Sequence, residues 1–274
     1  MSDLISIVVS TYERPDALGA ALRGLSRQSD RAFEVIVADD GSGPATADVI
    51  TQWKTALGAP LVHVRHEHLG FRAAEIRNRA IAASQGSYCV FLDGDCIPRA
   101  DFVAQHRRLA EPGWFVAGNR ILLSEPLTRT VLAQNLEPEI WGFGRLLEHR
   151  HNGINRITPA LSLPLGPLRK LAPKRWEGAR TCNLAVARSD LDRVDGFDAS
   201  FNGWGLEDSD LAIRLIHAGV RRKDGRFATG VFHLWHREND RAGLAGNQAR
   251  LDDVMRGDRI RALRGLSSLA PTHA

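Results

Sequence analysis

Cysteine, long apolar runs and familiar nucleotide-binding motifs are scarce or absent in this sequence of 274 residues. It has three cysteines, Cys89, Cys96 and Cys182, with no Cys-x-x-Cys pair among them. The odd number argues against a disulfide framework and favours a reducing compartment. No apolar run approaches the ~18–20 residues of a membrane-spanning helix, and no signal-peptide pattern opens the chain. We therefore expect a cytoplasmic protein that meets a membrane only at its surface.

Two common nucleotide-binding motifs are also missing. No Gly-x-Gly-x-x-Gly follows the first apolar run, and no Gly-x-x-x-x-Gly-Lys-Ser/Thr occurs anywhere, so dinucleotide and P-loop interpretations are weak. The net charge is +4 and the pI about 9.3. This excess suits phosphorylated ligands or an anionic membrane surface, and it is too small to predict nucleic-acid binding.

What the first hundred residues do contain is a regular alternation of strand and helix patterns. Apolar runs typical of buried parallel strands occur at 4–9, 33–38, 61–65 and 88–92. Helical spacing of apolar residues separates them, beginning at Pro15, which suits the first turn of a helix. The alternation predicts an α/β protein with a doubly wound, mostly parallel central sheet flanked by helices.

Carboxylates follow two of these strands directly. Asp39 and Asp40 come after the second, and Asp93-Gly94-Asp95 comes after the fourth. Ligands of open α/β sheets bind at the carboxyl ends of the strands, where Thr11 also falls. Paired carboxylates there predict a hard divalent ion, Mn2+ or Mg2+, shared with the phosphates of a ligand. The alternative is a turn in which Asp93 caps the next segment and Asp95 is solvated.

Two arginines, Arg72 and Arg77, lie just before the fourth strand. Either could bind a diphosphate in a bidentate manner, and either could instead lie on a solvated helix face.

A proline-rich, basic segment follows the α/β half. Residues 128–180 hold nine Arg or Lys against four Glu, a net charge of +5. We expect a mobile, loop-like region there, serving as an acceptor-binding lid, a contact with anionic lipid headgroups, or only a solvated linker.

A second constellation is Gly203-Trp204-Gly205-Leu206-Glu207-Asp208. The glycines let the backbone present the indole of Trp204 as a flat apolar face for a sugar ring. A helix is expected to start near Glu207, and its dipole alone would justify acids there. Asp210 has Arg214 four residues later, which predicts an ion pair on the helix surface. Asp208 has no such partner and is the first candidate for a general base, with Glu207 second.

His233 and His236 form the last candidate pair. An imidazole beside carboxylates can complete a metal site. In an extended run, positions i and i+3 face opposite ways, so we expect that both rings cannot easily reach one ion. The remainder of the chain predicts one basic helix and a loose tail.

The order of these motifs resembles family 2 glycosyltransferases of the GT-A fold. The resemblance rests on Val9-Ser10-Thr11-Tyr12-Glu13-Arg14, Asp39-Asp40-Gly41-Ser42, Arg77-Asn78 and Asp93-Gly94-Asp95. The block from Gly203 to Asp208 is similar to that of β-1,4-galactosyltransferases and chondroitin-polymerase-like domains. The similarity covers about 1–125 and 176–240 and omits the basic middle.

The resemblance implies a nucleotide-sugar donor, expected to be a UDP-sugar, and a role for each matching residue. Thr11 and Asp40 would contact the uracil or ribose, Arg77 the nucleotide, and Asp93 the ribose or sugar. Asp95 and His236 would bind the metal, with His233 standing where relatives often have methionine. Trp204 and Glu207 would contact the acceptor, and Asp208 would deprotonate it. The other expected substrate-binding residues are Tyr12, Arg14, Asp39 and Arg72.

These implications define an inverting, metal-dependent glycosyltransferase acting on a hydroxyl of a saccharide or glycolipid, with bacterial surface polysaccharide biosynthesis as the expected setting. Residues 1–125 would bind the nucleotide sugar. Residues 126–240 would form a smaller acceptor-side extension containing the basic loop region 138–180, and 241–274 a helix and tail. The competing interpretations are a degenerate scaffold or sugar-binding protein and, less favoured, a haloacid-dehalogenase-like phosphatase. In that phosphatase family the aspartate motif sits near the first strand.

Overall fold

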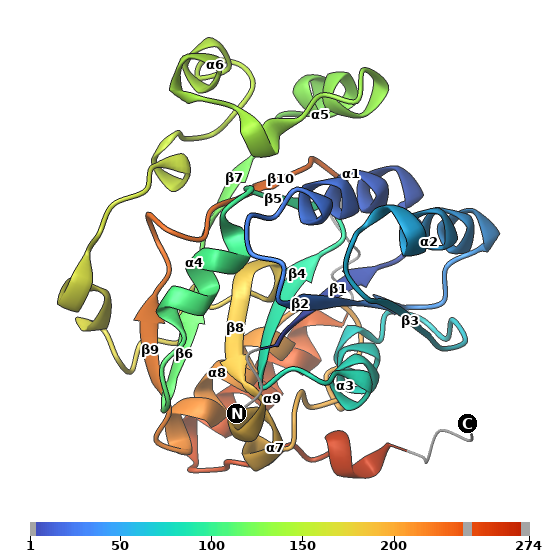
Figure 1. Cartoon of the computed structure of the whole chain (residues 1–274). Helices are drawn as coiled ribbons and strands as arrows, with labels where there is room; N and C mark the ends of the chain where they lie inside the picture. Colours follow the sequence, from blue (N-terminus) through green and yellow to red (C-terminus); the bar gives the residue numbers. More distant parts are fainter. Residues whose placement is uncertain (1–3, 238–242, 270–274) are drawn as a thin grey trace.

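The computed structural model describes residues 4–237 and 243–269. Its centre is a sheet of seven strands in the order β3-β2-β1-β4-β8-β6-β9 (Figure 1). The sheet confirms the predicted doubly wound, mostly parallel architecture. Its strands are β1 (Ile5–Thr11), β2 (Phe33–Asp39), β3 (Leu61–Arg65), β4 (Tyr88–Asp93), β6 (Trp114–Ala117), β8 (Leu184–Ala187) and β9 (Arg221–Asp224).

The four N-terminal strands are parallel, and their register brings the predicted carboxylates to one edge. Thr11 pairs with Asp39 across β1 and β2, and Ser10 pairs with Asp93 across β1 and β4. Strand β8 runs antiparallel to both β4 and β6. It therefore brings the chain that precedes it, at the end of the basic segment, to the same edge of the sheet.

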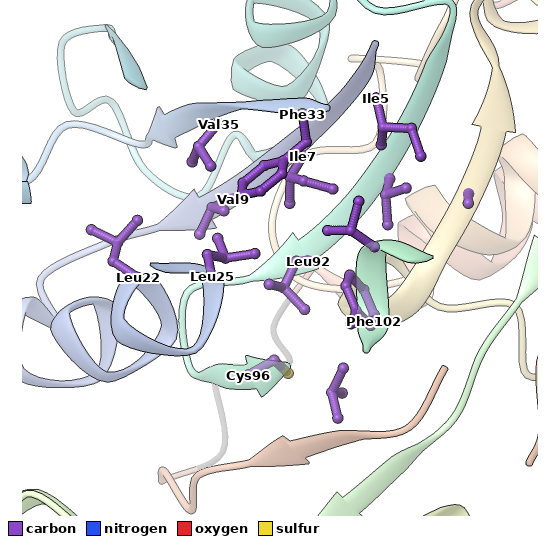
Figure 2. Packing of buried hydrophobic residues seen from close by; sticks show 14 of the residues in the cluster. Ile5, Ile7, Val9, Leu22, Leu25, Phe33, Val35, Leu92, Cys96 and Phe102 are labelled. Atoms are coloured by element: carbon purple, nitrogen blue, oxygen red, sulfur yellow. The ribbon is translucent and has the colours of Figure 1, made fainter. Parts of the chain in front are cut away.

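Helices cover both faces of this sheet. On one face Leu22 and Leu25 of α1 pack toward Val9 and Leu92 of the sheet (Figure 2). Full burial of each such leucine contributes about 2 kcal/mol from the hydrophobic effect. Apolar residues of α3, α7 and α8 cover the other face. The helices are α1 (Pro15–Ser26), α2 (Pro44–Ala56), α3 (Ala73–Ala83), α4 (Phe102–Leu109), α5 (Glu125–Ala133), α6 (Phe143–Glu148), α7 (Arg188–Val194), α8 (Glu207–His217) and α9 (Leu244–Arg256).

A second, three-stranded sheet lies beyond the end of β4. Its strands are β5 (Cys96–Pro98), β10 (Val231–His233) and β7 (Arg120–Leu122), in that order. Strand β10 runs antiparallel to β5 and places His233 opposite Cys96. The short sheet thus brings the histidine segment to the aspartates that follow β4.

The C-terminal segment is bound to the domain where the structure describes it. Asp195 accepts hydrogen bonds from Ser267, and Asp198 pairs with Arg259 at 2.8 Å. The expectation of a loose tail is therefore wrong for residues 257–269, while 238–242 and 270–274 of the predicted C-terminal region lie outside the described residues. None of the described helices is long and apolar enough to cross a membrane.

Candidate active site

The turn between β4 and β5 is held tightly against β1. The Gly94 amide donates to the carbonyl of Ser10 at 2.7 Å. A Cβ on residue 94 would lie 2.9 Å from that oxygen and 3.1 Å from the Cβ of Thr11. A side chain would force β1 and the turn apart, so glycine is required between the two aspartates. The hydroxyl of Thr11 is buried there without a hydrogen-bond partner.

Asp95 meets both histidines. One carboxylate oxygen lies 3.4 Å from Nε2 of His233, and the other lies 3.4 Å from Nε2 of His236. The expectation that the two rings face apart is wrong, because β10 ends at His233 and the residues after it, up to His236, are not part of a strand. The Cys96 thiol lies 3.7 Å from the Asp95 carboxylate.

This cluster fits a divalent ion by the chemistry of its donors. It offers a carboxylate and two imidazoles, ligands that Mn2+ and other first-row ions accept. Burial lowers the pKa of His233, which keeps its imidazole neutral and able to bind a metal. The ligand atoms of Asp95, Cys96 and His233 all lie within 4.8 Å of one another. Burial raises the pKa of the Cys96 thiol, so Asp95, His233 and the nearby His236 are the residues that could hold the ion.

Arg77 is buried in the middle of the site and is bonded to protein groups in three directions. It donates to Ser10 Oγ at 2.9 Å and to Glu207 at 2.9 Å, and it lies 3.4 Å from Asp93. Burial opposes its charge, but Glu207 and Asp93 outweigh burial and raise the pKa of the guanidinium. Sequence reasoning assigned Arg77 to the nucleotide and Glu207 to the acceptor, whereas the structure pairs them with each other.

Asp93 is a carboxylate of the motif whose ionisation is disfavoured by burial. Burial raises its pKa to about 6, with Arg77 opposing the shift and Asp95 and Glu207 adding to it. A cation placed beside this turn would favour the ionised form.

Asp208 lies in the first turn of α8 and forms no ion pair among the described residues. Its carboxylate accepts only from the amide and hydroxyl of Ser209. Burial, followed by the charge of Glu207, raises its pKa to about 7, against the opposing effects of Arg77 and Arg180. A group that titrates near neutral pH and has few protein partners suits a general base.

The loop before α8 is shaped by left-handed backbone. Gly203, Gly205 and Leu206 have φ angles of 74°, 103° and 77°. The side chain of Asn247 on α9 donates to the carbonyls of Asn202 and Gly205, at 3.1 and 3.0 Å. Trp204 is thus carried on a loop fixed at both ends, next to Glu207 and Asp208.

Asp210 and Arg214 form the predicted pair, at 2.7 Å, but both side chains are fully buried. The expectation of a surface pair is wrong because the C-terminal segment covers this side of α8, and its Arg259 also reaches Asp210. The pair fixes α8 within the domain, and the first turn of the helix lies at the site.

Asp39 and Asp40, at the end of β2, are bonded to the protein on both oxygens. Asp39 accepts from the Ser42 amide at 2.8 Å and contacts His63 at 2.9 Å. Asp40 contacts His66 at 2.5 Å and accepts from the Arg72 amide at 2.9 Å. Burial alone would raise the pKa of Asp39, but the bonds from His63 and Ser42 outweigh it and lower the pKa.

The remaining predicted donor-site residues lie on the rim of this edge. The ring of Tyr12 stacks on His68 with centroids 4.4 Å apart. Arg14 pairs with Asp16, and the Arg72 side chain pairs with Glu75. The structure does not bring Arg14 or Arg72 into contact with the Asp93–Asp95 turn.

Sequence reasoning missed Arg120. This partly buried arginine, at the start of β7, donates to the sulfur of Cys182 at 3.7 Å and acts electrostatically on both Asp93 and His233. No local motif marks it, because the short sheet brings it to the site from 25 residues beyond Asp95.

Fold and site together define a class: an α/β protein with a carboxylate–histidine cluster at the ligand-binding edge of its sheet and a candidate base nearby. The comparisons make this specific. Residues 6–164 match glycosyl transferase family 2, and residues 170–237 match the N-terminal domain of galactosyltransferase. The chain belongs to glycosyl transferase family 2.

Curated relatives agree with this membership. The chain is 29% identical over 246 residues to a validoxylamine A glucosyltransferase of Streptomyces hygroscopicus subsp. jinggangensis, covering 83% of this chain and 55% of the relative. It is 27% identical over 230 residues to a chondroitin synthase of Pasteurella multocida, covering 78% of this chain and 23% of the relative. The chain thus spans about half or less of these proteins.

Solved structures confirm the GT-A fold. The mannosyltransferase PcManGT of Pyrobaculum calidifontis, in complex with GDP-Man and Mn2+, superposes with a TM-score of 0.62 at 20% identity, covering 92% of this chain and 64% of that one. TarS of S. aureus, residues 1–349 with UDP, gives 0.60 at 12% identity, covering 92% and 65%.

Proposed function

We propose that the protein is an inverting, metal-dependent glycosyltransferase that moves a sugar from a UDP-sugar to a hydroxyl of a saccharide acceptor. The observation that carries the proposal is the Asp95–His233–His236 cluster, lying at the same sheet edge as a carboxyl, Asp208, whose pKa is raised to about 7. The intact cluster and base favour catalysis over a degenerate scaffold. A fourth-strand position for the Asp-Gly-Asp motif disfavours a phosphatase.

On the donor side, Asp95, His233 and His236 would hold Mn2+ or Mg2+. The bound ion would neutralise negative charge on the departing diphosphate. Arg120, which acts on both Asp93 and His233, would add a second positive charge beside the diphosphate. The stacked rings of Tyr12 and His68 offer a flat surface to the base at the rim. The solved neighbours bound to UDP and to GDP-Man with Mn2+ support this use of the fold.

On the acceptor side, Trp204 would support the sugar ring. Asp208 would take the proton of the acceptor hydroxyl as its oxygen forms the bond to the donor carbon, and the bond from that carbon to the diphosphate oxygen breaks on the opposite face. This in-line displacement converts an α-linked donor into a β-glycoside. Arg77 acts as a positioning residue, because its bonds fix Glu207, the neighbour of Asp208, relative to Asp93.

The setting we propose is bacterial surface polysaccharide synthesis with a saccharide or lipid-linked saccharide acceptor. Relatives named chondroitin synthase and a colanic acid biosynthesis glycosyl transferase support it. Peripheral contact with an anionic membrane is supported by apolar side chains exposed beside cations. Phe143 is 58% exposed two residues before Arg145, which pairs with Glu148, and Leu171 is 77% exposed one residue after Lys170, which pairs with Glu111. Sedimentation with phosphatidylglycerol vesicles, and not with phosphatidylcholine vesicles, is the expected result.

The decisive experiment is calorimetric titration of UDP into the purified protein with Mn2+, with Mg2+ and with EDTA. Binding that requires the metal supports the donor site, and conversion of an α-linked UDP-sugar into a β-linked product, read by NMR, supports inversion. Absence of metal-dependent UDP binding would point to another nucleotide or to a scaffold. An α-linked product would exclude the single displacement.

A further inference from the structure

Arg180 stands where the basic segment meets the proposed active site. Strand β8 pairs with β4 in antiparallel register as far as Leu184 opposite Phe91. The short helix Thr181–Asn183 continues the chain along β4, toward the turn that holds Asp93 and Asp95. Arg180 comes immediately before that helix, with extended backbone dihedrals of φ −133° and ψ 138°. It therefore lies at the ligand-binding edge of the sheet.

The guanidinium of Arg180 has no partner among the residues that the structure describes. The side chain is exposed and, among residues 4–237 and 243–269, it forms no hydrogen bond or ion pair. Glu177, three residues earlier, does not pair with it. Yet Arg180 is near enough to Asp208 to act on its carboxylate, alongside Arg77. Arg77 is already bonded to Ser10, Glu207 and Asp93, so of these two cations Arg180 is the one whose five N–H donors are all available.

An unpaired cation close to a general base makes that base less effective in catalysis. It lowers the basicity of Asp208 and so weakens proton removal. That effect disappears when a bound anion neutralises the guanidinium. The arrangement is therefore useful if the acceptor itself brings a negative charge.

We infer that Arg180 binds an anionic group, a carboxylate or a phosphate, on the acceptor sugar whose hydroxyl Asp208 deprotonates. A planar guanidinium matches either oxyanion in a bidentate manner. The donor diphosphate is a less suitable partner, because it belongs beside Asp95 and Arg120, whereas Arg180 acts on Asp208. The inference rests on the proposed function and adds the class of acceptor: a uronic acid or a phosphosugar.

The test compares glycosides that differ only in charge. Binding of p-nitrophenyl β-glucuronide and of p-nitrophenyl β-glucoside is measured by saturation-transfer NMR competition, with and without UDP and Mn2+. Glucose 6-phosphate and glucose form the second pair and distinguish a phosphate from a carboxylate. Wild-type protein is expected to prefer the anionic member of at least one pair by about 10- to 100-fold, the range for a hydrogen-bonded charge pair.

Variants then assign the preference to one residue. Arg180→Ala is expected to abolish the preference and Arg180→Lys to keep a smaller one, because an ammonium lacks the bidentate fork. Arg175→Ala is the matched control: it removes an exposed arginine five residues earlier in the same segment, and the preference should persist.

Equal affinity for both members of each pair, no binding of any of them, or a preference that survives in Arg180→Ala would overturn the inference. Metal-dependent UDP binding is measured on the same samples and reports the donor site. Its absence in the wild-type protein would count against the proposed function, separately from the role of Arg180.

Discussion

Two groups of carboxylates lie at one edge of the same sheet, and they differ in how the protein treats them. Asp39 and Asp40 each accept or share hydrogen bonds on both oxygens, from Ser42, His63, His66 and the Arg72 amide. Among the described residues, Asp95 has two imidazoles at 3.4 Å and the Cys96 thiol at 3.7 Å, all longer contacts, and Asp208 accepts only from its neighbour Ser209.

The pKa directions of Asp39 and Asp208 follow this division. The pKa of Asp39 is lowered although burial opposes this, whereas burial raises that of Asp208 to about 7. A carboxylate whose hydrogen bonds come from the fold is structural, and one left without them is reserved for a ligand, an ion or a proton. The comparison therefore separates acids that sequence alone treats as equivalent.

The substitution Asp208→Asn is the strongest test of this division between structural and functional carboxylates. Losing a general base is expected to lower kcat by about 10³-fold, within the usual range for such groups. UDP binding with Mn2+ should stay within twofold of wild type, because Asp208 touches neither the ion nor the nucleotide in the proposed mechanism. Rates with a saturating donor and acceptor check this, and a kcat within tenfold of wild type would remove Asp208 from the role.

Replacing Asp95 tests whether this carboxylate binds the metal ion. Asp95→Ala is expected to weaken metal-dependent UDP binding by more than about 100-fold, beyond the cost of losing an outer-shell partner. His236→Ala should weaken it less, since a second imidazole remains. The matched control is Asp101→Asn, a carboxylate outside the predicted site that pairs with Arg99. Calorimetry with Mn2+ gives the ranking, and a loss in Asp101→Asn as large as that in Asp95→Ala would remove Asp95 from the role.

The pH dependence follows from the raised pKa of Asp208. Below a pKa of about 7 the carboxyl is protonated and cannot accept the acceptor proton, so kcat/KM should fall tenfold per pH unit. Above it the rate should level off. The residual kcat/KM of Asp208→Asn should no longer fall as the pH is lowered. If it still falls below the same pH, the titration belongs to another group.

Asp39→Asn is expected to affect stability more than catalysis. Its lowered pKa means that the ionised form stabilises the folded state above the unfolded value of about 4, and that this stability is lost as pH falls through the folded pKa. The substitution should cost about 1.5–3 kcal/mol at pH 7, the worth of hydrogen bonds to a charged group. Urea unfolding at pH 7 and pH 3 measures it, and the difference between proteins should shrink at the lower pH.

The features that could be predicted from the sequence are those encoded by contiguous residues. The apolar runs of β1, β2 and β4 and the aspartates that follow them are contiguous, so the parallel sheet and its ligand edge could be predicted. Long-range pairings could not. The Arg77–Glu207 bond joins residues 130 positions apart, and β8 is a four-residue strand with no turn signal. The i, i+3 argument for the histidines failed because it assumed an extended run as far as His236, whereas β10 ends at His233.

The smallest effect that we predict is the change in stability caused by Asp208→Asn. A raised folded pKa means that ionising Asp208 costs stability, with a penalty that is absent below pH 4 and complete above pH 7. Asp208→Asn should therefore stabilise the protein above pH 7, by about 1 kcal/mol once partial exposure is allowed for. Asp210→Asn, two residues along α8, is the matched control. It leaves the buried Arg214 without its anion and should destabilise by about 3–5 kcal/mol. Two aspartates in the first turn of one helix would then change stability in opposite directions, which a purely structural role for both cannot produce.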